Sequence, residues 1–224
     1  MSKRITVAID GPAGAGKSTL ARRIASKLGY TYIDTGAMYR AVALWALRTK
    51  VALSDMHRLE QLANEARIEF KPDTTAVLLN GEDVTEAIRA PEIGGAASEI
   101  SRIPAVRRAL VAKQRAFGEQ VSVVMEGRDI GSVVFPDATI KIFLDAQLEE
   151  RTERRARESS LPADVVAQHI HERDRSDRTR SESPLVQAPD AVYVDTTGLT
   201  IDEVEAALLK LIRGRTSNGK ERTH

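Results

Sequence analysis

Residues 11–19, with the sequence GPAGAGKST, constrain the fold of this chain more than any other segment. They match the pattern Gly-x4-Gly-Lys-Ser/Thr, in which glycines let backbone N–H groups converge on phosphate oxygens. The apolar, β-branched residues 5–9 before this loop predict a buried strand. Apolar residues at helical spacing after the loop predict a helix that Gly29 ends, and the positive end of that helix adds to the attraction for phosphate.

This strand–loop–helix context predicts a site for a nucleoside triphosphate. Lys17 is expected to contact the β- and γ-phosphates and to act in catalysis, and the Ser18 hydroxyl is expected to bind Mg²⁺. The residues expected to line the triphosphate site are Gly11, Pro12, Ala13, Gly14, Ala15, Gly16, Lys17, Ser18 and Thr19.

The composition limits the classes of protein that this chain could be. Its 224 residues are enough for one main domain with its own core, and 42% of them are hydrophobic and 29% charged. A net charge of +1 gives no reason to expect a nucleic-acid or membrane partner, and a monomer is the default expectation. Without cysteine, disulfides, thiol nucleophiles and Cys-ligated metals are excluded. The chain shows neither a long apolar run nor a signal-like N-terminus, so we expect it in the cytoplasm.

Apolar strands alternate with helices along most of the chain. This order predicts an α/β fold with a central five-stranded parallel sheet. Ligands of such sheets lie beyond the carboxyl ends of the strands, where we expect four carboxylates, those of Asp10, Asp34, Glu126 and Asp145. The expected strands are residues 5–9, 30–33, 121–125, 140–144 and 192–194, and the main expected helices are residues 20–28, 38–46, 55–66, 91–101, 148–159, 163–174 and 201–212, with another that starts near Pro104.

Residues 67–84 differ from the rest, because apolar and polar residues alternate there. Such alternation is typical of a strand with one solvated face, and Asn80-Gly81 between apolar segments is a strong hairpin signal. We therefore expect a small antiparallel insert in this region.

Two of the predicted strands are followed by side chains suited to binding a phosphorylated acceptor. Thr35 and Arg40, one helical turn apart, can face the same cleft. Glu126 could order Mg²⁺ and its waters, and the Arg128 guanidinium could bind a phosphate through two hydrogen bonds. Asp129 could accept a hydrogen bond from an exocyclic amine, as acidic side chains do from cytosine N4.

The segment 151–180 is rich in arginine, with Glu and Asp between the arginines. For most of these arginines we expect exposed, salt-bridged helices. A helix, a break near Leu161-Pro162 and a second helix is also what a closing lid would look like, and phosphoryl transfer needs cations around the moving group.

Taken together, these segments resemble the bacterial cytidylate kinases, within the nucleoside monophosphate kinases. The matching segments follow one another over nearly the whole chain and are IDGPAGAGKST (9–19), DTGAMYRA (34–41), EGRDIGSVVFPDA (126–138), KIFLDA (141–146), ERDRSDRTR (172–180), SPL (183–185) and DTT (195–197).

The resemblance implies phosphoryl transfer from ATP to CMP or dCMP, with Mg²⁺. It implies a P-loop kinase core of residues 1–66 and 102–224, with a lid at about 151–172, a monophosphate-binding insert at 67–101 and a disordered tail from 214. Lys17, Arg128, Arg155 and Arg173 would be catalytic. The CMP phosphate would contact Arg40, Arg128 and Arg173, the cytosine Ser98, Arg107 and Asp129, and the ribose Thr35, Asp177 and Arg180.

Two positions depart from the family pattern. Glu126 stands where aspartate is expected in many members, which makes its role near the metal less secure, and Ser132 stands where threonine is common. The main alternative is a P-loop kinase for another nucleotide or a small hydroxylated metabolite, with Asp34 as the base. A GTPase-type switch is disfavoured, because the chain lacks an Asn-Lys-x-Asp segment.

Overall fold

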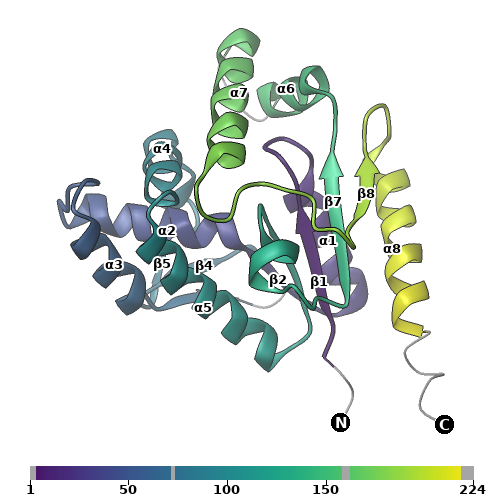
Figure 1. Ribbon diagram of the computed structural model, residues 1–224, viewed down its shortest axis with the longest axis horizontal. Helices are drawn as coiled ribbons and strands as arrows, with labels where there is room; N and C mark the ends of the chain where they lie inside the picture. The colour runs from purple at the N-terminus through teal and green to yellow at the C-terminus, as the bar shows by residue number, and fades with distance from the viewer. Residues whose placement is uncertain (1–3, 72–73, 158–161, 218–224) are drawn as a thin grey trace.

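Five parallel strands form the centre of the computed structural model, which describes residues 4–71, 74–157 and 162–217. They lie in the order β2-β6-β1-β7-β8, so the strand that leads into the phosphate-binding loop is central (Figure 1). The predicted five-stranded parallel sheet is thereby confirmed. The strands are β1 (Thr6–Asp10), β2 (Thr31–Asp34), β6 (Val123–Gly127), β7 (Ile140–Asp145) and β8 (Val192–Asp195).

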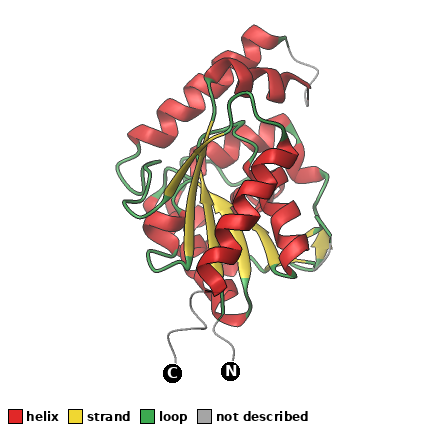
Figure 2. Ribbon diagram, turned by 90° about the vertical axis from the view of Figure 1, so that its right-hand side faces the viewer, coloured by secondary structure: helices red, strands yellow, loops and turns green. Residues whose placement is uncertain are grey.

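Helices cover both faces of this sheet, giving three layers (Figure 2). Val7, Ile9 and Val124 pack on one side against α1 (Lys17–Leu28) and α8 (Ile201–Ser217). On the other side, buried residues such as Met125 pack against α5 (Pro104–Gln120) and a short π-helical turn, η2 (Ile130–Val134). Because side chains alternate along a strand and both faces of the sheet are covered, β1, β6 and β7 are mostly apolar rather than alternating apolar and polar.

A second, antiparallel sheet contains β3 (Ile68–Phe70), β4 (Val77–Leu79) and β5 (Glu82–Asp83). Asn80 and Gly81 join β4 to β5 with φ angles of 53° and 88°, the left-handed values that a tight two-residue hairpin requires. The predicted hairpin is confirmed. The chain then continues through η1 (Ala87–Arg89) into α4 (Pro91–Ile100).

The insert does not have a hydrophobic core of its own. Its buried residues join one cluster with those of α2 (Thr35–Arg48), α3 (Met56–Glu65) and α5. Ile68, Val84 and Ile100 belong to this cluster together with Met38 and Leu59. The apolar packing is therefore continuous across residue 66, and the division into core and insert remains a prediction.

Helices α6 (Leu148–Arg157) and α7 (Ala163–Thr179) pack on each other beyond the carboxyl ends of the strands (Figures 1 and 2). The predicted break at Leu161 and the helix end near Ser159 lie outside the described residues. Helix α7 continues past Asp174, where the sequence predicted its end, which brings Asp177 onto the same helix as Arg173.

Three other boundaries differ from the sequence-based expectations. Strand β6 starts at Val123 because α5 runs to Gln120 and Val121 is its C-cap, so Glu126 lies within the strand rather than after it. Helix α8 continues to Ser217, so residues 214–217 are helical and not part of a disordered tail. The rest of the expected tail, 218–224, lies outside the described residues. Within the described ranges, no helix is both long and apolar enough to cross a membrane.

Candidate active site

The phosphate-binding loop turns sharply from β1 into α1. Gly11 has a φ of 148°, and a Cβ there would lie 1.9 Å from the Leu144 carbonyl oxygen on the neighbouring strand, so only glycine fits. No side chain caps the start of α1, which leaves its first N–H groups available to a ligand. The Lys17 ammonium group donates a hydrogen bond of 2.6 Å to the Pro12 carbonyl oxygen and so folds back over the loop.

Lys17 lies in a buried environment that contains both cations and anions. Only 5% of the residue is exposed. Burial, and then the positive charge of Arg128, lower the pKa of Lys17 to about 7, against the opposing effect of Glu126. A polyanionic ligand in the loop would favour the charged form of this lysine.

Three of the four predicted strand-end carboxylates accept hydrogen bonds from backbone N–H groups. Asp10 accepts hydrogen bonds of 2.8 and 2.7 Å from the N–H groups of Ile130 and Gly131. Asp34 caps α2 by accepting from the Ala37 N–H group and pairs with Arg40 at 2.7 Å. Asp145 accepts from the N–H group of Ala146. Asp34 and Glu126 are register neighbours on β2 and β6, whereas Asp10 and Asp145 accept hydrogen bonds from other backbone groups.

Glu126 is the strand carboxylate that lies against the phosphate-binding loop. It is 4% exposed and lies beside the Ser18 hydroxyl, and the Tyr32 phenol donates to its Oε1 atom at 2.9 Å. Burial, followed by repulsion from Asp34, raises the pKa of Glu126. The Thr35 hydroxyl donates to the Glu126 backbone oxygen at 2.7 Å, which fixes the strand end.

The predicted acceptor residues form a dense charge cluster between β6 and α7. Arg128 Nε donates to Asp177 Oδ2 at 2.8 Å, and Arg180 lies 3.7 Å from the other oxygen of Asp177. Burial and the nearby Arg128 lower the pKa of Arg173 to about 10, and Arg40 and Arg155 contribute to this shift. All the predicted phosphate-binding arginines are therefore close to one another.

Arg107 and Asp129 form a buried ion pair at one side of this cluster. Their side chains are 4% and 9% exposed. Arg107 also donates to the Ser101 carbonyl oxygen at 3.2 Å, and its guanidinium carbon lies 5.6 Å from the centre of the Tyr39 ring. The pair presents a donor and an acceptor together in a site that excludes most water.

Three guanidinium groups of this region have unused donors. Within the described residues, the buried Nε atoms of Arg40, Arg107 and Arg180 have no hydrogen-bond partner. Buried unpaired donors are costly unless a ligand or water satisfies them, so they are typical of a binding site. Ser98 is half-buried on α4, and no hydrogen bond of its hydroxyl to another described residue is present.

Helices α6 and α7 are anchored to the phosphate-binding loop. Arg151 Nη1 donates to the Ala13 carbonyl oxygen at 2.9 Å and to Asp174 at 2.6 Å, and Asp174 accepts from the Ala13 N–H group at 3.2 Å. The expectation of exposed, salt-bridged arginines is wrong for Arg151, which is 6% exposed, but it fits the exposed pair of Arg157 with Glu153.

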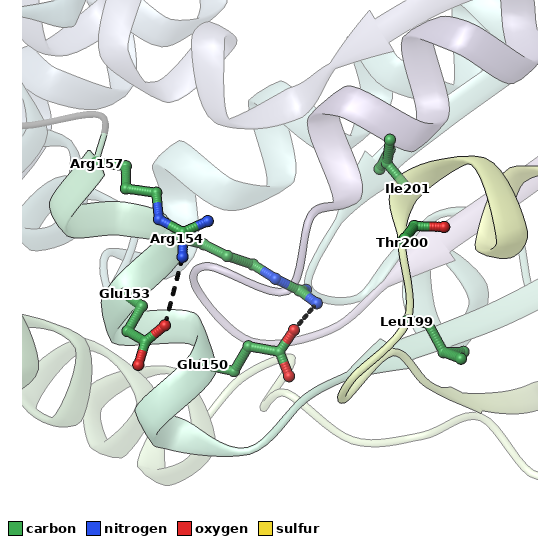
Figure 3. Close-up of a pocket in the computed structure, with 7 residues that line it drawn as sticks. All are labelled: Glu150, Glu153, Arg154, Arg157, Leu199, Thr200 and Ile201. Carbon is green, nitrogen blue, oxygen red and sulfur yellow. Dashed lines mark hydrogen bonds and ion pairs between the residues drawn. The ribbon is translucent and has the colours of Figure 1, made fainter.

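A cavity of about 500 Å³ borders the loop on the side of α6 and α8 (Figure 3). Arg154 crosses it, pairing with Glu150 and donating to the Thr196 hydroxyl at 3.0 Å and carbonyl oxygen at 2.9 Å. The cavity is lined by Glu150, Glu153, Arg154, Arg157, Leu199, Thr200 and Ile201.

Sequence reasoning missed three side chains of the site: Tyr32, Tyr39 and Asp174. Tyr32 and Asp34 are two residues apart on one strand and so share a face of the sheet. This spacing is the one signal in the sequence that could have identified Tyr32. Asp174 lies next to Arg173 in the segment 172–180, where seven of nine residues are charged, and nothing in the pattern separated it from its neighbours.

The comparisons with known proteins show which family the chain belongs to. A sequence model described as cytidylate kinase matches residues 7–214. A cytidylate kinase of Solibacter usitatus is 60% identical, with 98% of this chain and 97% of that protein covered. A cytidylate kinase of Pelotomaculum thermopropionicum is 50% identical, with 96% of each covered.

Solved structures show the fold independently of close sequence similarity. An uncharacterized protein from Eubacterium ventriosum superposes with a TM-score of 0.57 at 14% identity, covering 95% of this chain and 99% of its own. A gluconokinase from Sinorhizobium meliloti superposes with a TM-score of 0.52 at 15% identity, covering 99% of this chain and all of its own. The family resemblance drawn from the motifs is confirmed by the relatives at 60% and 50% identity. This chain belongs to the cytidylate kinase family.

Proposed function

We propose that this protein transfers the γ-phosphoryl group of ATP to the phosphate of CMP or dCMP, with Mg²⁺. The observation that carries the proposal is the position of Lys17 between two groups of residues. On one side is the phosphate-binding loop, and on the other is the cluster of Arg128, Arg173 and Asp177, whose charges shift its pKa. A donor phosphate and an acceptor phosphate would meet at this cationic centre.

The acceptor phosphate supplies the nucleophilic oxygen, so this reaction needs no protein base. Catalysis then consists of positioning the two phosphates and stabilising the charge of the moving group. Lys17, Arg128 and Arg173 are buried or half-buried cations suited to that role, and Arg155 lies near enough to influence Arg173. Arg40 would complete the binding of the acceptor phosphate.

The ion pair of Arg107 with Asp129 supports a cytosine specificity. Cytosine offers an N4 amino group as a donor, and N3 and O2 as acceptors. Asp129 would accept from N4 and Arg107 would donate to the acceptors. Uracil has an oxygen in place of the N4 amino group, which a carboxylate would repel. Ser98 on the nearby α4, with Thr35, Asp177 and Arg180 for the ribose, completes the proposed set.

The cavity beside α6 is the proposed place for the adenine of ATP. It borders the phosphate-binding loop, since Arg154 Nη1 lies 3.9 Å from where a Gly16 Cβ would be. Its arginine side chains offer flat guanidinium groups for stacking on a purine ring, and Leu199 and Ile201 offer apolar contact (Figure 3).

The residues around Ser18 fit Mg²⁺. The Ser18 hydroxyl at the start of α1 lies beside the buried carboxylate of Glu126, and oxygen ligands of this kind suit a hard cation. No group of three or more His, Cys, Asp and Glu side chains that could hold a metal occurs in the described part of the chain, so water and phosphate oxygens would provide most ligands. Bound Mg²⁺ neutralises negative charge on the β- and γ-phosphates.

The alternative is a P-loop kinase for a hydroxylated metabolite or another nucleotide. Phosphorylating a hydroxyl calls for a carboxylate base, and Asp34 was the candidate. Its carboxylate is engaged by the Ala37 N–H group and by Arg40, which disfavours this role. The three unpaired Nε donors also suit an anionic acceptor better than a neutral one.

An acceptor panel tests the proposal. ADP formation is measured with Mg²⁺–ATP and CMP, dCMP, UMP, AMP, GMP or shikimate. We expect rapid turnover with CMP and dCMP. Rapid turnover confined to another acceptor would overturn the assignment of Arg107 and Asp129, and no turnover with any acceptor would overturn the proposed reaction.

A further inference from the structure

The phenol of Tyr32 lies where the phosphate-binding helix α1, the edge strand β2 and the strand β6 meet. It donates to Glu126 Oε1 at 2.9 Å and lies beside the Ser18 hydroxyl. Its ring packs against the hydrophobic cluster under α1, so the side chain is held at both its apolar and its polar end. Among the described residues, Tyr32 is the side chain whose hydrogen bond to the Glu126 carboxylate has a defined geometry.

The strand register explains this contact. In the parallel pair of β2 and β6, Tyr32 is paired with Val124, and Asp34 with Glu126. Paired residues, and residues two apart, point to the same face of the sheet. Tyr32 is therefore a diagonal neighbour of Glu126, at a separation that an aromatic side chain can bridge.

Glu126 needs such an anchor. A glutamate has one more rotatable bond than an aspartate, so an unanchored carboxylate at this position would sample more orientations, and fixing it has an entropic cost. Asp34 lies beside it in register but is already bonded to Arg40 and to the Ala37 N–H group. A phenol provides a donor without a positive charge, so it orients the carboxylate without adding a cation beside a metal site.

We propose that Tyr32 is a positioning residue that holds the Glu126 carboxylate against Ser18 in the orientation that recruits Mg²⁺ with ATP. This inference rests on the proposed function, because it concerns the metal of that reaction. Tyr32 donates to Oε1 of Glu126, and the carboxylate held in this way would accept hydrogen bonds from waters of the metal. It acts through Glu126 and does not itself contact the phosphates.

The test compares ATP binding with and without metal in the protein with Tyr32→Phe, a change that removes only the hydroxyl. Dissociation constants for ATP are measured by calorimetry, first with excess Mg²⁺ and then with EDTA. We expect binding in Mg²⁺ to weaken by about 3- to 10-fold, as for the loss of one hydrogen bond to a charged group. Binding in EDTA and binding of CMP should stay within about 2-fold, since neither uses Glu126.

Tyr30→Phe is the matched control. Tyr30 is half-buried in the same cluster, and its phenol makes no hydrogen bond to another described residue, so this variant should bind like the wild type in both conditions. A second variant, Glu126→Gln, closes a double-mutant cycle. If Tyr32 acts through Glu126, adding Tyr32→Phe to Glu126→Gln should have little further effect on binding in Mg²⁺.

The outcomes separate this inference from the proposed function. If Tyr32→Phe weakens ATP binding equally in Mg²⁺ and in EDTA, or leaves both unchanged, the positioning role is wrong while the proposed reaction stands. If Tyr32→Phe weakens ATP binding in Mg²⁺ by the same factor in the Glu126→Gln protein as in the wild type, the positioning role is also wrong. If wild-type protein binds ATP equally well with and without Mg²⁺, the metal site itself is wrong, and the inference falls with it.

Discussion

Arg128 and Asp177 bond to each other at 2.8 Å across the site, from the end of β6 to the last turn of α7. Burial acts to raise the pKa of Asp177, but the combined positive charges of Arg128, Arg173 and Arg180 outweigh this effect and lower the pKa. In the ligand-free protein, a proposed phosphate-binding group is thus neutralised by a proposed ribose-binding group. CMP binding would replace part of this pairing with contacts to the nucleotide.

Asp177→Asn is expected to lower kcat/KM for CMP by about 10- to 100-fold, because a hydrogen bond to a charged partner is worth about 1.5–3 kcal/mol. The KM for ATP should change less than about 2-fold, since the residue lies on the acceptor side. Initial rates at varied CMP and ATP measure both. Arg175→Gln, on the exposed side of α7, is the control. An equal loss for ATP and CMP would show that α7 as a whole has moved.

Asp129→Asn should reduce discrimination between CMP and UMP more than it harms ATP binding. An amide can rotate to donate to the uracil oxygen, while a carboxylate repels it. We expect the CMP-to-UMP ratio of kcat/KM to fall by about 10-fold or more, the loss of one base-specific contact. Competition between the two acceptors in one assay gives the ratio directly. If activity with both falls by the same factor, Asp129 does not read the base.

ATP binding should take up a proton at pH 8. The pKa of Lys17 is lowered to about 7 in the free protein, so the amine is largely neutral at pH 8, and the ATP phosphates should restore its charge. Calorimetry in buffers of different ionisation enthalpy measures this uptake, which should be absent in Lys17→Arg because arginine stays charged. Identical uptake in the two proteins would contradict the prediction.

The same shift affects folding. Between pH 7 and 10.5 the unfolded chain carries the Lys17 proton more often than the folded protein does. The contribution of Lys17 to the free energy of unfolding therefore rises with pH through that window. Urea unfolding of the wild type and of Lys17→Met is measured at pH 7 and 9. The free energy of unfolding of the wild type should rise, relative to that of the variant, from pH 7 to pH 9. A constant difference would mean that Lys17 is not titrating there.

Two glycines in helices should respond oppositely to alanine. A Cβ at Gly95 in α4 meets no atom within 4 Å, so Gly95→Ala should stabilise the protein by about 0.5–1 kcal/mol through the lower entropy of the unfolded chain. A Cβ at Gly118 in α5 would lie 2.6 Å from the Phe135 ring, so Gly118→Ala should destabilise it by about 1–3 kcal/mol. Denaturant midpoints measure both. A destabilised Gly95→Ala would show that α4 needs the flexible residue.

The sheet and the phosphate-binding loop could be predicted because their signals are local. Apolar runs such as residues 123–125 mark buried strands, and the glycines of residues 11–19 are required by the backbone conformation of the loop. Strand order could not be predicted this way, since β1 pairs with residues more than a hundred positions away. That pairing depends on the packing of the whole chain.

The site residues also divide into those with a local signal in the sequence and those without one. Arg128 and Asp129 directly follow a strand, so the rule for parallel sheets indicated them. Tyr32 and Asp174 have roles that come from contacts made only after folding, with Glu126 and with the Ala13 backbone. The pairing of Asp10 with the N–H groups of Ile130 and Gly131 is also tertiary. Apart from the two-residue spacing of Tyr32 and Asp34, no spacing in the sequence predicts these contacts.

The central place of β1 has a consequence for synthesis on the ribosome. The strand that leads into the phosphate-binding loop is among the first to leave the exit tunnel, yet both strands that flank it, β6 and β7, come after residue 122. A nascent chain that ends near residue 120 carries the complete loop sequence without either neighbour to hold it. Nucleotide affinity should therefore appear late in translation. Until β6 and β7 emerge, β1 remains unpaired, and a chaperone would protect it from aggregation during this period.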